Sequence, residues 1–120
     1  MRAKWFVCAV VAIAAITAPG IASGSLSQCA AGHVCLWGNN DFQWLIADRT
    51  AGSGTITNLS GEANNQMDSW ANRSSSYAAC GYGGANGTGD RQHWGPNSND
   101  NNVAPWNSDE VSSWRTRYGC

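Results

Sequence analysis

Short runs of apolar and β-branched residues, separated by turn residues, follow one another along most of the chain. His33–Trp37 and Phe42–Ile46 are two such runs, and the turn residues 38–41 between them predict a β-hairpin. Further short strands are expected at 55–59, 69–70 and 77–82. No window of ten or more residues after the N-terminal segment has the 3.6-residue period of a helix. This spacing of strands and turns is typical of an all-β sandwich or barrel.

Segment 83–106 is different, because Gly, Asn, Asp, Pro and Ser dominate it. We expect it to be mostly irregular, with few strands. Trp94 and Trp106 lie in this segment. Since loops often carry binding residues, these two side chains are candidates for contact with a partner.

A Ser-Trp-x-x-Arg sequence occurs twice, and its Trp residues, Trp70 and Trp114, lie 44 positions apart. A second pair of aromatic residues, Trp37 and Tyr82, lies 45 positions apart. A period of this length indicates a repeated supersecondary unit. We therefore expect two such units packed face to face. Trp70 and Trp114 are expected in the core, because a chain poor in Leu and Ile needs aromatic side chains to supply buried area.

The first 22 residues predict a secretory signal peptide. Residues 1–4 carry Arg and Lys, 5–16 form an apolar run of 12 residues, and small residues follow up to Ala22. The apolar run is too short to span a membrane comfortably. Cleavage after Ala22 would leave one domain at 23–120, so we expect a secreted protein with no membrane association after cleavage.

Removing this segment changes the charge of the chain. The remaining 98 residues contain five Arg, no Lys and eight Asp or Glu, which gives a formal net charge of −3. No basic cluster is present that would bind nucleic acid. A chain of this size forms one small domain with a limited core, and we expect it to be a monomer.

Four cysteines remain after cleavage, and in a short exported chain they predict two disulfides. Cys29 and Cys35 are close together across a tight turn, whereas Cys80 and Cys120 lie near the two ends of the second repeat. We therefore favour the pairs Cys29–Cys35 and Cys80–Cys120. A metal-thiolate site is the alternative, but the chain has no Cys-x-x-Cys pair.

The two repeats resemble the βγ-crystallin Greek-key motif, which has an aromatic, four residues, an aromatic, one residue and Gly, and later a polar pair followed by Ser or Thr and Ser. Segments 37–44 and 82–89 approximate the first part, and 64–69 and 108–113 the second. Two positions depart from the first part of the motif, and in the second part Asp68 replaces the usual Ser or Thr and Ser108 the usual Asp or Asn. Trp44 stands where Gly is expected, and Gly87 stands where the second aromatic is expected, so we expect neither hairpin to be standard.

The opening Cys29-x5-Cys35-Leu36-Trp37 is similar to that of the bacterial peptidase inhibitor family I36, and the similarity extends over residues 29–117. That family is βγ-crystallin-like in fold, and its type member inhibits metalloproteinases. The resemblance implies an all-β sandwich of two Greek keys, at about 29–76 and 77–120. It also implies a proteinaceous inhibitor whose partner is a secreted peptidase, and no enzymatic activity.

The βγ-crystallin resemblance also implies a calcium site, because the polar pair and the later Ser or Thr supply oxygen ligands crosswise between the two motifs. The corresponding residues are Asn65, Asp68, Asp109 and Ser112. Calcium takes six to eight oxygen ligands, and all four side chains carry oxygen. The alternative is that these side chains only stabilise turns. The fold requires no cofactor, and calcium is the one cofactor that we consider.

An inhibitor has to present a rigid exposed segment to its enzyme. The candidates for this segment are His93, Trp94, Pro96 and Trp106. Two alternatives remain open. One is a calcium-binding structural or stress module without an enzyme target, and the other is a cell-wall or glycan-binding module that uses Trp94 and Trp106. The chain has no zincin motif, catalytic-triad context or phosphate-binding loop that would indicate an enzyme.

Overall fold

The computed structural model describes residues 24–120, which form an all-β domain with short 3₁₀ turns. The predicted signal peptide at residues 1–22 lies outside this range. The strands are β1 (His33–Asn39), β2 (Gln43–Thr50), β3 (Thr57–Asn58), β4 (Ser69–Asn72), β5 (Ala79–Tyr82), β6 (Arg91–Trp94), β7 (Ser98–Asp100) and β8 (Ser113–Arg115). The 3₁₀ turns are η1 (Leu26–Gln28), η2 (Asn40–Phe42), η3 (Gly61–Ala63) and η4 (Ala85–Gly87).

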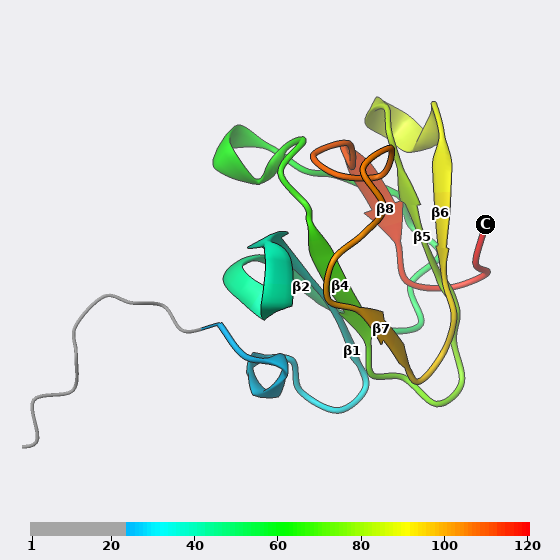
Figure 1. The fold of residues 1–120 in the computed structure, drawn as a ribbon. Coiled ribbons are helices and arrows are strands. Elements are labelled where there is room, and N and C mark those ends of the chain that lie inside the picture. The colour runs from blue at the N-terminus through cyan, green and yellow to red at the C-terminus, as the bar shows by residue number, and fades with distance from the viewer. Residues whose placement is uncertain (1–23) are drawn as a thin grey trace, which may run out of the picture.

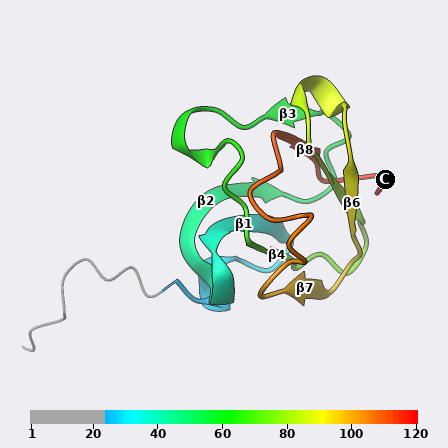
Figure 2. The ribbon, with the colours of Figure 1, turned by 45° about the horizontal axis from the view of Figure 1, so that its top comes forward.

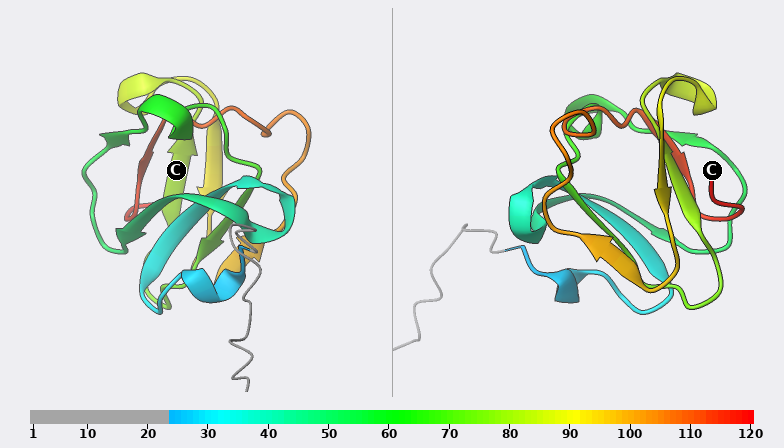
Figure 3. Two further views of the ribbon diagram at one scale, coloured as in Figure 1. Left: turned by 90° about the vertical axis from the view of Figure 1, so that its left-hand side faces the viewer. Right: turned by 45° about the vertical axis from the view of Figure 1, so that its right-hand side comes forward.

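The strands form two four-stranded antiparallel sheets, in the orders β2-β1-β4-β7 and β3-β8-β5-β6 (Figure 1). Each sheet therefore takes three strands from one repeat and the third strand of the other. The expectation of two separate units packed face to face is wrong in this respect, because β3 and β7 cross between the repeats. Figures 2 and 3 show the two sheets from other directions.

Within each repeat the fourth strand lies beside the first and the first beside the second. This is the order 4-1-2 of a Greek key, with its third strand transferred to the opposite sheet. Strands β6 and β7 lie in segment 83–106, which was expected to be mostly irregular. Most of the segment is irregular, as expected, but these two strands were not predicted, because their residues are polar and the strands are held by pairing with β5 and β4.

The duplicated Ser-Trp sequence has a structural role that is the same in both repeats. Ser69 Oγ donates to the Asn39 carbonyl at 2.8 Å and accepts from the Phe42 N–H at 3.2 Å. Ser113 Oγ makes the equivalent bonds to the Gly84 carbonyl at 2.6 Å and the Gly87 N–H at 2.9 Å. Each Ser thus holds the bend of its own hairpin, and the Trp that follows it points into the core.

The two hairpins bend alike although the first lacks glycines at the bend. Trp44 has φ 63°, and Gly89, which lies 45 positions later, has φ 78°. The left-handed conformation suits Gly and is rare for a bulky residue. The ring of Trp44 packs on Gly38, where an added Cβ would lie 2.1 Å from Cε3 of the ring. Trp44, which was expected to make this hairpin non-standard, is therefore accommodated by a strained left-handed backbone and by the packing of its ring on Gly38.

The core between the sheets contains three tryptophans. Trp70 and Trp94 stack with ring centroids 5.7 Å apart, and Trp94 and Trp114 meet edge to face at 6.4 Å. The prediction that Trp70 and Trp114 belong to the core is confirmed. The other buried members of this cluster are Val34, Leu36, Met67, Ala79, Val103 and Val111.

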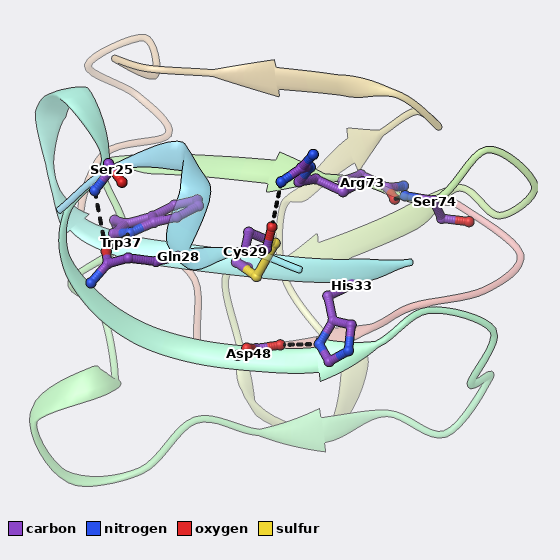
Figure 4. Close-up of a disulfide and its surroundings, with 10 residues drawn as sticks. Ser25, Gln28, Cys29, His33, Trp37, Asp48, Arg73 and Ser74 are labelled. Carbon is purple, nitrogen blue, oxygen red and sulfur yellow. Dashed lines mark hydrogen bonds and ion pairs between the residues drawn. A yellow bond between two sulfur atoms is a disulfide. The ribbon is translucent and has the colours of Figure 1, made fainter. Parts of the chain in front are cut away.

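The first strand of each repeat is buried on its outer face as well, where a disulfide attaches one end of the chain. The bonds are Cys29–Cys35 and Cys80–Cys120, which is the pairing favoured from the sequence. On the first repeat, η1 lies over Trp37, and Gln28 Oε1 accepts from the indole Nε1 at 2.9 Å (Figure 4). The metal-thiolate alternative is excluded for these four cysteines, because all of them are oxidised.

Candidate functional site

The connection from β7 to β8 contains a tight turn that carries an exposed tryptophan. The Asn107 N–H donates to the Ala104 carbonyl at 2.8 Å, and the Ser108 N–H donates to the Pro105 carbonyl at 3.4 Å. Trp106 lies at the tip of this turn with 78% of its surface exposed. It is the most exposed large apolar side chain in the described part of the chain. Its ring therefore contributes little to the core and is available to a partner.

Contacts on both sides of Trp106 hold this connection in place. Val103 is buried in the core, and Gln92 Nε2 donates to the Asn107 carbonyl at 3.0 Å. At its start, Asn101 Nδ2 donates to Asp41 Oδ1 at 2.9 Å, and the Asp41 N–H donates to the Asn101 carbonyl at 2.7 Å. The exposed ring is thus presented on a turn that is fixed to the core, to β6 and to the first hairpin.

The first repeat contains the same turn without the tryptophan. The Ala63 N–H donates to the Ser60 carbonyl and the Asn64 N–H to the Gly61 carbonyl, both at 3.3 Å. Glu62 occupies the tip, 44 positions before Trp106. Since this turn forms equally well with Glu at its tip, the fold does not require Trp106. Trp106 is therefore a candidate for contact with a partner, because its exposed ring lies on a connecting segment and is not needed for the turn.

The two polar segments that resemble the calcium motif meet each other crosswise. The Asn65 N–H donates to the Val111 carbonyl at 3.0 Å, and the Asp109 N–H donates to the Met67 carbonyl at 3.1 Å. Asn65 and Asp109 also share the left-handed conformation, with φ 58° and 55°. The backbone of the two segments is therefore arranged alike around the contact.

The side chains of this contact differ between its two halves. In one half, Ser112 Oγ donates to Asn65 Oδ1 at 2.7 Å, so both groups are satisfied and uncharged. In the other half the carboxyl groups of Asp68 and Asp109 lie together, and Ser108 Oγ donates to Asp68 Oδ1. Burial raises the pKa of Asp109, and the neighbouring Asp68 raises it further by charge repulsion and a side-chain hydrogen bond.

Only the half with Asp68 and Asp109 suits a calcium ion. Two carboxyl groups and the Ser108 hydroxyl give oxygen ligands, and a divalent cation would relieve the repulsion that raises the pKa of Asp109. The half with Asn65 and Ser112 offers no charge. Among residues 24–120 no three His, Cys, Asp or Glu side chains gather as a metal cluster, so water and carbonyl groups would have to complete the coordination.

Comparison with known proteins identifies the chain. The model of a family described as peptidase inhibitor family I36 matches residues 22–90, which is more than half of the chain. The chain belongs to peptidase inhibitor family I36. Because this is a family of inhibitors, the protein is not expected to be an enzyme. No curated protein sequence matches the chain significantly.

Solved structures similar to this family member have the βγ-crystallin fold. One, from work on the evolution of the eye-lens βγ-crystallin domain fold, is 18% identical with a TM-score of 0.61, and covers 78% of this chain and 89% of its own. A mutant βγ-crystallin domain from Clostridium beijerinckii is also 18% identical, with a TM-score of 0.54 and coverage of 68% and 93%. The N-terminal domain of Protein S is 24% identical, with a TM-score of 0.51 and coverage of 69% and 92%.

The other candidate contact residues do not lie on the turn of Trp106. His93 is exposed on β6, where its Nδ1 accepts from the Cys120 N–H at 3.3 Å, and Pro96 is exposed between β6 and β7. Trp94 is fully buried, so its selection as a contact residue was wrong. Trp94 and Gln92 both point inward from β6, while the residues before each of them are exposed. The ring of Trp94 fills the core beside Trp70.

Two shallow grooves in the surface of this family member lack the groups of an active site. One of about 370 Å³ lies between the N-terminal segment and β7, and the other, of about 300 Å³, lies beside β2 and β3. Among their lining residues, Asp48 is the only carboxylate, and there is no His or Cys. Within residues 24–120 there is also no helix with the length and apolar character needed to cross a bilayer.

The sequence patterns did not lead us to some surface residues of interest. The equivalence of Glu62 and Trp106 was not noticed, although the 44-residue period places them at corresponding positions of the two repeats. Tyr77, Arg117 and Tyr118 were not considered either, and they gather near the C-terminal end of the chain. The second copy of Ser-Trp-x-x-Arg ends at Arg117 and was the available signal.

Proposed function

We propose that the protein is a secreted inhibitor of extracellular metalloproteinases and that Trp106 is its principal contact with the enzyme. The observation that carries this proposal is the exposed ring of Trp106 at the tip of a fixed turn whose counterpart in the first repeat carries Glu62. Tryptophan is enriched among the residues that dominate binding energy at protein interfaces. A turn that is already rigid loses little conformational entropy on binding.

The choice of metalloproteinases follows from the resemblance to family I36, whose type member inhibits this class. Secretion is supported by the two disulfides, which persist in oxidising compartments, and by the signal-like pattern of residues 1–22. We expect the inhibitor to act as a monomer.

The test is an inhibition panel of purified secreted metallo- and serine peptidases, assayed with micromolar oxidised protein. We expect at least one metalloproteinase to be slowed and the serine peptidases to be unaffected. If only serine peptidases are slowed, the metalloproteinase assignment is wrong. If no peptidase is slowed, the inhibitor proposal fails as a whole.

A second candidate function, calcium binding, rests on the Asp68 and Asp109 pair, whose mutual repulsion a divalent cation would relieve. Thermal melting in excess EDTA and then in millimolar calcium tests it. At one hundred times its dissociation constant a ligand stabilises by about 2.7 kcal/mol, which is roughly 10 °C or more in a domain of this size. Asp109→Asn should abolish the shift. An unchanged melting temperature in the unsubstituted protein would exclude a calcium site that stabilises the fold.

The glycan-binding alternative loses half of its basis. It relied on Trp94 together with Trp106, and the ring of Trp94 is buried in the core. A single exposed tryptophan remains, which suits a protein contact at least as well. We therefore do not propose it.

A further inference from the structure

Two arginines and two tyrosines form a surface patch near the C-terminal end of the chain, and we name Tyr77, Arg115, Arg117 and Tyr118 the Arg–Tyr patch. The Arg117 guanidinium lies 4.7 Å from the ring centroid of Tyr118 and 5.6 Å from that of Tyr77. The Arg115 guanidinium lies 5.9 Å from the Tyr118 ring. Tyr118 is 66% exposed and Tyr77 is 38% exposed. Guanidinium groups and aromatic rings therefore alternate across the patch.

The backbone beneath this patch is held firmly. Arg115 donates to the Gly119 carbonyl through Nε at 3.0 Å and through Nη2 at 2.7 Å, and the Gly119 N–H donates to the Ala78 carbonyl at 3.0 Å. Tyr118 has φ 72°, a conformation that is rare for a residue with a large side chain. Its ring lies on Gly54, where an added Cβ would be 2.6 Å from Cε2 of the ring. A strained, highly exposed tyrosine is thus kept in one position.

The first repeat shows what the same arginine does when it only supports the fold. Arg73 is the equivalent of Arg117, and its Nη1 donates to the Cys29 carbonyl at 2.6 Å, which fastens the N-terminal segment (Figure 4). Ser74 follows it and is buried. In the second repeat the Arg117 guanidinium instead lies over the rings of Tyr77 and Tyr118, and the exposed Tyr118 takes the place of Ser74.

The charges of the patch are not neutralised within the described residues. The one ion pair found in residues 24–120 joins His33 and Asp48, so no carboxylate pairs with Arg115 or Arg117. Guanidinium groups match carboxylates in geometry, and Arg and Tyr are both enriched where binding energy concentrates at protein interfaces. The complementary partner is therefore a protein segment rich in Asp or Glu.

Other polyanions suit the patch less well. Arg115 and Arg117 alone cannot track a phosphate backbone, and the chain without residues 1–22 has a net charge of −3. Guanidinium groups lie near both tyrosine rings, so the rings offer less open face for stacking against a sugar.

We infer that the Arg–Tyr patch is a second docking surface, which binds an acidic protein segment. This surface goes beyond the proposed function and does not depend on it. In Figures 1 and 2 the C-terminus lies on one side of β5 and β6, and the connection that carries Trp106 lies on their other side. The two surfaces can therefore be tested separately.

The experiment uses the oxidised protein and a short fluorescent polyglutamate peptide, followed by fluorescence anisotropy at low ionic strength. We expect binding that weakens as salt is added. Arg117→Glu should weaken it by about tenfold or more, and Tyr118→Asn, which tolerates the left-handed conformation, by several-fold. Melting curves of both variants check that they fold.

Arg91→Glu is the matched control, since it makes the same charge change at an exposed position of β6. Arg91→Glu and Trp106→Ala should leave the affinity for polyglutamate within about twofold of the original. Absence of binding, or an equal loss in Arg91→Glu and Arg117→Glu, would overturn the inference. Tighter binding of polygalacturonate or of a single-stranded oligonucleotide than of polyglutamate would overturn the assignment to a protein partner. None of these measurements involves a peptidase, so they are readable whether or not the inhibitor proposal holds.

Discussion

The two repeats of this chain have the same backbone plan but use it differently, and each serves as a control for the other. They share the Ser that holds the hairpin, the core Trp of β4 or β8, and a disulfide on the outer face of the first strand. They differ where the backbone permits several side chains. Positions that agree explain the fold, whereas positions that differ on the same backbone indicate local packing or contact with a partner.

One difference lies in the core. Trp94 on β6 stacks on Trp70, and the equivalent position on β2 is Arg49, whose guanidinium lies 4.9 Å from the ring centroid of Trp114. The guanidinium also donates to the Trp114 and Thr55 carbonyls, both at 2.9 Å. A buried indole and a partly buried arginine thus cover the two equivalent tryptophans. Placing Arg49 over Trp114 removes water from the charged guanidinium, and this burial lowers the pKa of Arg49 from its usual value.

The largest difference in stability between the repeats should come from their disulfides. In the chain-entropy model, the 40-residue separation of Cys80 and Cys120 contributes about 4 kcal/mol, and the 6-residue separation of Cys29 and Cys35 about 2 kcal/mol. We expect Cys80→Ala with Cys120→Ala to lower the free energy of unfolding about twice as much as Cys29→Ala with Cys35→Ala. Urea unfolding measures both. A larger loss from the first disulfide would mean that the N-terminal cover over Trp37, rather than loop closure, dominates.

Substitution of Arg49 should lower stability less than removal of the Cys80–Cys120 disulfide. Arg49→Met keeps an apolar side chain over Trp114 but removes the charged hydrogen bonds and the cation–π contact, and should destabilise by about 2 kcal/mol. Arg91→Met, at an exposed position of the equivalent strand β6, should change stability by no more than about 0.5 kcal/mol. Equal effects of the two substitutions in urea unfolding would show that Arg49 contributes nothing beyond its apolar stem.

The smallest change in stability is expected on substitution of Asp109, the residue of the second repeat that corresponds to Asn65 of the first. Folding raises the pKa of Asp109 above its ordinary value of 3.8, so the folded state keeps a proton that the unfolded state has already lost. Stability therefore falls as the pH rises through the interval between the two values, and the penalty persists at higher pH.

Asp109→Asn removes this penalty, which solvent screens at this exposed position, and should stabilise the protein at pH 7 by no more than about 0.5 kcal/mol in EDTA. The gain should disappear well below pH 3.8, where Asp109 is protonated in both states. Glu62→Gln removes the same charge from the exposed turn of the first repeat and should change nothing measurable. Urea unfolding at both pH values tests this, and a gain from Asp109→Asn that persists in acid would refute the electrostatic cause.

The sequence predicted the features that are repeated within it. The two Ser-Trp sequences led to the period and to the core positions of Trp70 and Trp114, because a duplicated pattern reports a structural requirement. The spacing of short strands and turns led to the all-β class. The short separation of Cys29 and Cys35 led to the observed disulfides. Strand β6 was missed because its local composition is polar. Its equivalence to the end of β2 carries the information that local composition lacks.

The exchange of β3 and β7 between the repeats could not be read from local patterns. Both strands are short and polar, and they form because β8 and β4 offer free edges. The same limit affected the candidate site. Trp94 and Trp106 lie in similar surroundings in the sequence, yet one fills the core and the other is exposed, and only the placement of β6 distinguishes them.

We expect the turn of the second repeat to carry a binding function that the turn of the first repeat lacks. The most direct test measures inhibition constants against one metalloproteinase from the panel for the unsubstituted protein, Trp106→Ala and the matched control Glu62→Ala. Loss of an aromatic residue that dominates an interface costs about 2 kcal/mol or more, so Trp106→Ala should raise the inhibition constant roughly thirtyfold without lowering the melting temperature. Glu62→Ala should leave it unchanged. Full inhibition by Trp106→Ala, or an equal loss in both variants, would contradict the account.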